Sequence, residues 1–302
     1  MATTSNCRGL GETRILYPMV EDRNGDAGGR PQRRRAEDGR PGRDNYRDRK
    51  RPGASSAPRR SGPDRARRAQ PQHPSSDAES AAPGAPRIPD SIEAKQLAPE
   101  IRAELFTLDK TTADTVARHL VAAGELMDTD PEAALAHAQA ARTRSGRIAA
   151  IREAVGVAAY HCGDWAQALS EFRAARRMGS KSQLLPLIAD CERGVGRPEK
   201  AIDLARSEEA AQLTGDDADE MRIVAAGARA DLGHLDQALA VLSSPPPDPS
   251  RSGSTAARLC YAYADILLAL GRTDEALQWF LHAAAADTEG VTDAEDRVGE
   301  LG

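Results

Sequence analysis

The chain has 302 residues, of which 40% are apolar and only 3% aromatic, a composition too polar for one compact globule of this length. The formal net charge of −5 hides two parts of opposite sign, because residues 1–70 hold 18 basic and 9 acidic side chains and the remainder is acidic. No apolar run reaches the length of a membrane span or of a signal-peptide core, so we expect a cytoplasmic protein.

The basic residues near the start of the chain gather in residues 30–68, which hold 15 basic and 5 acidic side chains and no Leu, Ile, Val, Phe or Trp. A Pro-rich spacer follows at 71–90. Neither segment can bury enough apolar surface to offset chain entropy, so we expect residues 1–90 to be disordered.

Arginine forks suit phosphate groups, which makes the basic tail a candidate contact for RNA, DNA or another polyanion. A solvated tail without a defined ligand is the simpler alternative. The candidate contacts are Arg33, Arg34, Arg35, Arg49, Lys50, Arg51, Arg59, Arg60, Arg67 and Arg68.

A seven-residue phrase recurs five times in the rest of the chain. Its copies are TDPEAAL, GDWAQAL, GRPEKAI, GHLDQAL and GRTDEAL, which begin at Thr129, Gly163, Gly196, Gly233 and Gly271. The copies are 34, 33, 37 and 38 residues apart, which fits a unit of two helices and two turns. In the second copy, Gly163 separates two apolar stripes of helical spacing, and Asp164 is placed to cap the second helix.

These residues resemble the tetratricopeptide repeat, a helix-turn-helix unit of 34 residues. The residues of the second copy that match its pattern are Gly156, Gly163, Ala168, Phe172 and Ala175, and those of the fifth are Gly271, Ala276, Phe280 and Ala283. The resemblance implies an all-α fold, a right-handed α-solenoid of about five such hairpins preceded by the disordered basic tail. Residues 117–202 are also similar to a family of actinobacterial tetratricopeptide proteins with arginine-rich amino termini, which adds no mechanism.

The periodicity places paired helices along residues 91–290. They are expected near 111–127 and 131–144, 146–162 and 164–178, 182–194 and 197–209, 217–232 and 235–243, and 254–270 and 273–286, in repeats near 115–145, 146–180, 182–210, 217–243 and 254–287. Pro99 marks a leading helix whose apolar edge of Ile101, Leu105 and Phe106 would cover the first repeat. Residues 243–254 should be an irregular loop that allows bending, and 288–302 a C-terminal tail.

No catalytic, cofactor or metal constellation emerges from the motifs, so we expect a noncatalytic protein without cofactors. The four cysteines stand singly, and His161 and Cys162 are helix neighbours that point about 100° apart. Gly194 and Gly196 lack the third glycine of a dinucleotide site and should end a helix. The acidic run at 216–220 is interpreted as the start of a helix capped through Asp217 and Glu220.

In the tetratricopeptide family, the first helices of the hairpins line a concave groove that binds partners. The repeat register places ten residues along that groove: His119, Glu153, Val157, Tyr160, His161, Asp190, Arg193, Glu220, Tyr261 and Asp265. The Lys and Asn pair with which chaperone-binding members clamp a carboxylate is absent. An acidic groove favours a basic or mixed peptide, although several of these side chains could instead face the neighbouring hairpin.

Two functional hypotheses follow. The first is a scaffold that binds a partner protein of unknown identity through the concave face. The alternative is an RNA- or ribosome-associated accessory protein anchored by its basic tail, and no membrane partner is expected.

Overall fold

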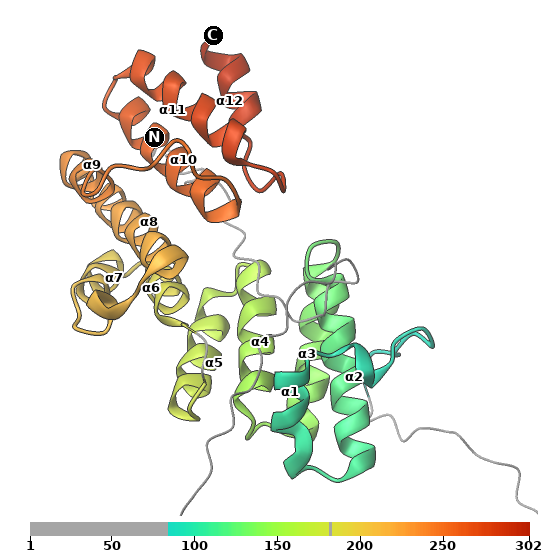
Figure 1. The fold of residues 1–302 in the computed structure, drawn as a ribbon. Helices are drawn as coiled ribbons and strands as arrows, with labels where there is room; N and C mark the ends of the chain where they lie inside the picture. The colour runs from blue at the N-terminus through green and yellow to red at the C-terminus, as the bar shows by residue number, and fades with distance from the viewer. Residues whose placement is uncertain (1–83, 181–182) are drawn as a thin grey trace, which may run out of the picture. The chain divides into compact units, whose positions relative to one another are not determined.

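The computed structural model describes residues 84–180 and 183–302, which contain helices and connecting segments and no β-strand (Figure 1). The α-helices are α1 (Pro99–Glu104), α2 (Lys110–Leu126), α3 (Pro131–Arg144), α4 (Ala149–His161), α5 (Trp165–Arg177), α6 (Leu185–Gly194), α7 (Pro198–Ala205), α8 (Gly215–Asp231), α9 (Leu235–Leu242), α10 (Ser254–Ala269), α11 (Thr273–Ala286) and α12 (Ala294–Leu301), and the 3-10 helices are η1 (Ala94–Gln96), η2 (Leu105–Thr107) and η3 (Ala210–Gln212). The candidate polyanion contacts in the basic tail lie outside the described residues.

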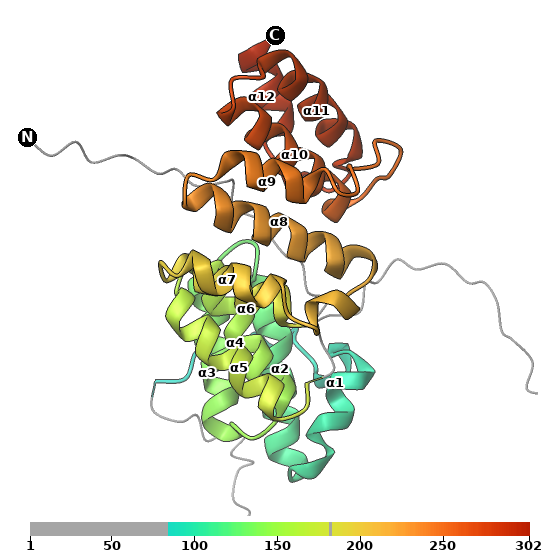
Figure 2. The same ribbon diagram turned by 90° about the vertical axis from the view of Figure 1, so that its left-hand side faces the viewer.

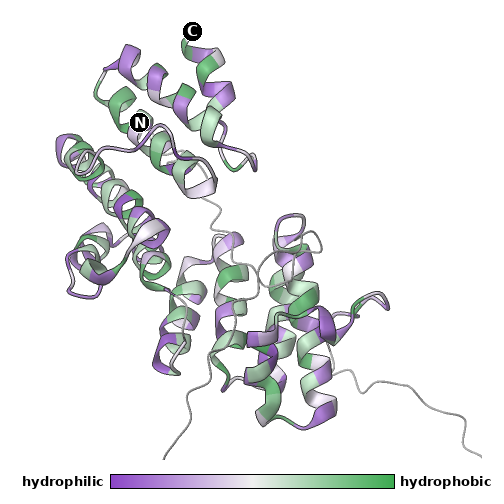
Figure 3. Cartoon of the chain, in the orientation of Figure 1, coloured by the Kyte–Doolittle hydropathy of each residue, from purple (hydrophilic) through white to green (hydrophobic). Residues whose placement is uncertain are grey.

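Ten of these helices form the five hairpins that the sequence predicts, from α2 and α3 to α10 and α11. The two helices of each hairpin pack together, and each second helix also contacts the first helix of the next hairpin, as can be followed in Figures 1 and 2. Figure 3 shows polar and apolar residues on each helix, as expected for helices with one buried side. The all-helical repeat architecture is therefore confirmed for the described residues.

The turns inside the last four hairpins each contain a glycine with a positive φ angle. Gly163, Gly196, Gly233 and Gly271 have φ values of 71°, 76°, 76° and 77°, in the left-handed region that glycine adopts at little cost. After Gly163, the Asp164 N–H donates to the Ala159 carbonyl at 2.9 Å, which satisfies one of the last carbonyls of α4. The Asp164 carboxylate then accepts from the Gln167 N–H at 3.0 Å, so the predicted cap of α5 is confirmed.

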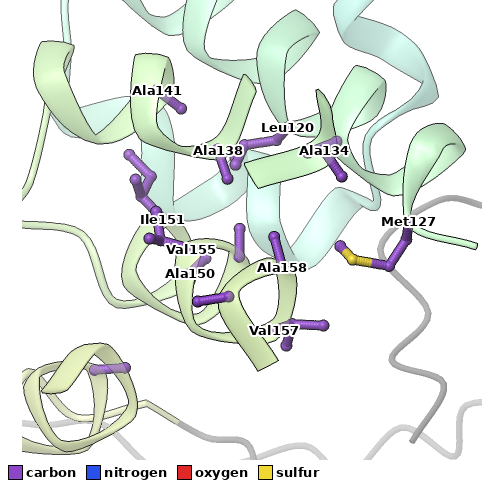
Figure 4. Packing of buried hydrophobic residues seen from close by; sticks show 14 of the residues in the cluster. Leu120, Met127, Ala134, Ala138, Ala141, Ala150, Ile151, Val155, Val157 and Ala158 are labelled. Atoms are coloured by element: carbon purple, nitrogen blue, oxygen red, sulfur yellow. The ribbon is translucent and has the colours of Figure 1, made fainter. Parts of the chain in front are cut away.

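Glycine also allows the close approaches that the hairpins need. A Cβ atom on Gly156 of α4 would lie only 2.6 Å from the ring of Phe172 on α5, and one on Gly194 of α6 would overlap the ring of Trp165. Phe172 therefore closes its own hairpin, whereas Trp165 packs against the next one. Figure 4 shows the neighbouring core, where small residues such as Ala134 and Ala138 lie opposite Leu120.

Both ends of the described chain differ from the sequence prediction. Residues 84–90 were expected to belong to the disordered tail, but Ile88 packs against the main apolar cluster. Phe106 was expected to cover the first repeat and is instead 84% exposed, because Leu105 begins a 3-10 turn that rotates the next side chain away from the core. At the other end, residues 288–302 do not form a simple tail, since α12 packs on α11 through Val298 and Leu301.

The Pro-rich loop between α9 and α10 is more firmly held than expected. Arg222 of α8 donates to the Leu242 carbonyl at 2.7 Å and to the Pro245 carbonyl, and Arg251 bonds Asp216 and Asp219 of α8 at 2.8 and 2.6 Å. These contacts tie both ends of the loop to one helix, which disfavours the bending that its composition suggests.

Candidate functional site

The first helices of consecutive hairpins are joined by polar side chains on the face where the sequence predicts a groove. The Tyr160 hydroxyl of α4 donates to the Asp190 carboxylate of α6, and Arg193 donates to Asp190 at 2.7 Å. Arg193 also donates to Asp231 of α8 at 2.8 Å, so one guanidinium links two helices. Burial, and then the charge of Asp190, raises the pKa of Tyr160, which keeps the phenol protonated as a donor.

Similar links continue toward the C-terminus. Glu220 of α8 and Arg258 of α10 form an ion pair in which each residue is 94% buried. The Arg258 Nε atom lies 3.1 Å from the Oε1 atom of Glu220. Asp265 of α10 lies 3.7 Å from Arg297 of α12, and that guanidinium also sits 5.4 Å from the centre of the Phe280 ring. Burial raises the pKa of both carboxyl groups, while the arginine charges oppose that effect.

Three of the predicted groove residues take part in packing. His119 is buried on α2 with its Nδ1 atom 3.0 Å from that of His137 on α3, and burial together with the charge of Arg144 lowers the pKa of His119 to about 4. Val157 lies in the main apolar cluster. Tyr261 is half-buried and meets Phe280 edge to face, with ring centres 5.2 Å apart.

The remaining two predicted residues, Glu153 and His161, are half-exposed on α4. Glu153 accepts a hydrogen bond from the Ser180 hydroxyl. The His161 ring lies 6.3 Å from Tyr160. Most of the predicted set thus faces a neighbouring helix, an alternative that the sequence left open.

Sequence reasoning missed the partners of these residues, although they follow a simple rule. Asp190 lies 30 residues after Tyr160, and Asp231 and Arg258 each lie 38 residues after their partners. A search for complementary side chains 38 residues apart, the longest spacing between two copies of the repeat, would have found the last two pairs. The result is a face on which charged groups are already paired and held in place.

The acidic run at 216–220 lies at the start of α8, as predicted, but Asp217 and Glu220 do not cap that helix. α8 begins at Gly215, so Asp217 lies in its first turn and Glu220 is too far along the helix to act as a cap. Asp219 and Glu220 are buried ion-pair partners instead, as their contacts with Arg251 and Arg258 show. An acidic cluster on one helix therefore serves contacts between hairpins.

The residues that the sequence offered as candidates for chemistry lack the surroundings of a reactive or ligand-binding site in the described residues. Burial, and then the nearby charge of Glu132, raises the pKa of the Cys162 thiol, which is opposite to what an activated nucleophile needs. Gly194 is the last residue of α6 and Gly196 forms the turn after it, as predicted. In residues 84–180 and 183–302, no three His, Cys, Asp or Glu side chains gather as a metal site. None of the helices in these ranges is long and apolar enough to span a membrane.

Residues 188–290, which run from the middle of α6 past the end of α11, match the family model described as tetratrico peptide repeat. The match supports a protein of the tetratricopeptide-repeat type, in agreement with the helical hairpins. Such repeats generally mediate protein–protein interaction, and the fold is typically a noncatalytic scaffold. No curated protein matches the sequence.

Proposed function

We propose that the protein is a noncatalytic scaffold that binds a segment of a partner protein along the first helices α6, α8 and α10. The observation that carries this proposal is the run of polar links between those helices, in which Arg193 joins α6 to α8 and Glu220 joins α8 to α10. Side chains that are already paired lose little entropy when a partner binds, which favours recognition by a preorganised surface.

The charge of this part of the chain indicates the chemistry of the partner. Residues 183–302 hold 22 acidic and 10 basic side chains, and Asp231 keeps 39% of its side chain exposed beside Arg193. Complementary charge favours a basic or mixed partner segment and speeds its approach. The resemblance to actinobacterial proteins with arginine-rich amino termini remains a prediction.

The RNA-associated alternative depends on residues 30–68, which lie outside the described residues. The acidic character of residues 183–302 disfavours phosphate contacts there. Removal of residues 1–83 should abolish RNA association if the tail is an anchor, and should leave protein association intact if the first helices bind the partner.

The sharper test uses photo-crosslinking from the full-length chain. A photoreactive residue replaces Asp231 at the end of first helix α8, and in a matched variant it replaces the exposed Asp236 of second helix α9. We expect a partner protein to be captured from position 231 and not from position 236. Capture from position 236 alone, or equally from both positions, contradicts binding along the first helices.

A further inference from the structure

The segment before the first hairpin, residues 88–108, lies across two first helices and is called the cover segment below. Its helix α1 contacts α4, and its 3-10 helices η1 and η2 contact α2, on the side away from α3 and α5 (Figures 1 and 2). Ile92, Leu97 and Leu105 are buried in the main apolar cluster. This is the first-helix side, which in the next hairpins is the proposed partner surface.

Two polar contacts fix the cover segment on this surface. The Arg118 Nε atom of α2 donates to the Ile92 carbonyl at 3.0 Å. The Ala150 N–H, in the first turn of α4, donates to the Glu104 carboxylate at 3.1 Å. Ile148, which precedes α4, offers no side-chain cap, so Glu104 supplies from another helix the acceptor that the start of α4 lacks.

The apolar contacts of α1 complete a recognisable pattern. Ile101 of α1 packs against the main cluster, and Leu105, the residue that ends α1 and begins η2 four positions later, is buried in that cluster. Four residues separate neighbours on one face of a helix, so the surface of α2 and α4 receives an apolar helix edge and a carboxylate beside it. This combination is how an amphipathic helical segment docks on a partner groove.

Several features of the cover segment favour its exchange with another segment. α1 has only six residues, and Ala98 at its start has no side chain that could cap it. Helices this short are marginal in water and depend on the surface that they contact. Phe106, next to the buried Leu105, leaves 84% of its surface exposed, so the segment does not bury its own aromatic residue.

We propose that the face of α2 and α4 is a peptide-binding surface occupied by the cover segment in the free protein. The partner that it fits is an amphipathic helix with the spacing of Ile101, Glu104 and Leu105, whose carboxylate would replace Glu104 at the start of α4. The inference rests on the proposed function because it names the partner chemistry of the same kind of face. A partner must displace the cover segment. The partner's apparent affinity therefore equals its intrinsic affinity multiplied by the fraction of molecules in which the surface is open.

The test uses the full-length chain and a fluorescent peptide with the sequence of residues 98–108. Glu104→Gln weakens the contact at α4, and Glu100→Gln is the matched control, because Glu100 is an exposed carboxylate in the first turn of the same helix. We expect Glu104→Gln to speed amide hydrogen exchange in residues 92–108 about tenfold without a change in α2 and α3, and to tighten peptide binding by a similar factor. The control should behave as the unmodified protein does.

A peptide that carries Gln in place of Glu104 should bind both proteins more weakly than the natural sequence. The proposal is wrong if the labelled peptide binds neither protein, or if residues 92–108 exchange together with α2 and α3 in one opening event. Because no partner protein is used, failure of the crosslinking experiment at Asp231 would leave this result intact, and the two proposals can fail separately.

Discussion

Residues 84–180 and 183–302 build the same helical hairpin but join consecutive hairpins in different ways. In the first region, most buried apolar side chains of α2 to α5 belong to one contiguous cluster, which extends to Ile188 and Cys191 in α6. Arg142 of α3 also pairs there with the buried Glu171 of α5. In the second region, the remaining buried apolar residues fall into five smaller clusters, and ion pairs such as Glu220 with Arg258 connect the first helices. Consecutive hairpins are therefore stacked on one continuous apolar cluster in the first region, and on several smaller clusters linked by charge pairs in the second.

The charge balance follows this division. Residues 84–180 hold 13 acidic and 12 basic side chains, whereas residues 183–302 hold 22 and 10. An acidic excess works against compactness through self-repulsion, and two of the arginines, Arg193 and Arg258, cross from one hairpin to the next. The two regions should accordingly respond to different perturbations.

Loss of the buried ion pair should have the largest effect. Glu220→Ala leaves the Arg258 guanidinium buried without its carboxylate, which should cost about 3 to 5 kcal/mol of unfolding free energy. Chemical denaturation and hydrogen exchange should locate the loss in α8 to α11. A double variant, Glu220→Leu with Arg258→Met, should recover most of it, and a double variant as unstable as the single one would show that packing rather than charge pairing matters here.

Acid should weaken the first region selectively. Because the pKa of His119 falls from 6.5 to about 4 on folding, the unfolded chain takes up the proton first, and stability should decline by up to about 3 kcal/mol between pH 6.5 and pH 4. His137, Arg144 and Arg118 all disfavour the added charge. Thermal unfolding across this pH range should show a smaller decline for His119→Gln.

Adding a methyl group to a glycine should have opposite effects in the tightly packed hairpins and in the more exposed C-terminal helix α12. Gly156→Ala places a Cβ atom 2.6 Å from the Phe172 ring and should cost about 1 to 3 kcal/mol through overpacking. Gly299→Ala in α12 meets no atom within 4 Å and should instead stabilise the helix by about 0.5 to 1 kcal/mol. Thermal melts of the two variants should shift in opposite directions, and a shared direction would contradict the packing at one of the two sites.

The smallest effect should come from salt. Raising the ionic strength from about 0.15 M to 1 M shortens the screening length from about 8 Å to 3 Å and weakens partly exposed pairs such as Arg193 with Asp231. We expect less than about 1 kcal/mol of lost protection from hydrogen exchange in α6 to α8. The amides of α2, whose buried apolar side chains belong to the main cluster, serve as the internal control. Equal losses of protection from hydrogen exchange in α2 and in α6 to α8 would contradict a greater role for ion pairs in the second region.

The sequence was informative about helices because each hairpin repeats the same turn and small-residue spacing. It missed α12, which lacks the recurring phrase and shows only Ala294, Val298 and Leu301 at helical spacing. The spacing of apolar residues also could not reveal that Leu105 starts a tighter turn, which is why Phe106 was placed wrongly.

The candidate site was predictable in part. Helical register identified Asp190, Glu220 and Asp265 as polar residues of first helices, and each of them contacts another helix. Asp190 accepts from Tyr160 of α4, Glu220 pairs with Arg258 of α10, and Asp265 pairs with Arg297 of α12. Register alone gives the side of a helix on which a residue lies and says nothing of its partner. That knowledge requires the distance between helices, which the sequence does not contain.

The contact of Trp165 with Gly194 limits how the repeat array can evolve. The indole ring fits only because the facing residue has no side chain, and at the next junction Arg193 lies where a Cβ atom on Gly227 would stand. These two junctions thus have different matched pairs, so the hairpins beside them are not interchangeable units. Duplicating, deleting or reordering one of them would place a large side chain against the wrong surface, and the array can vary by substitution far more readily than by shuffling.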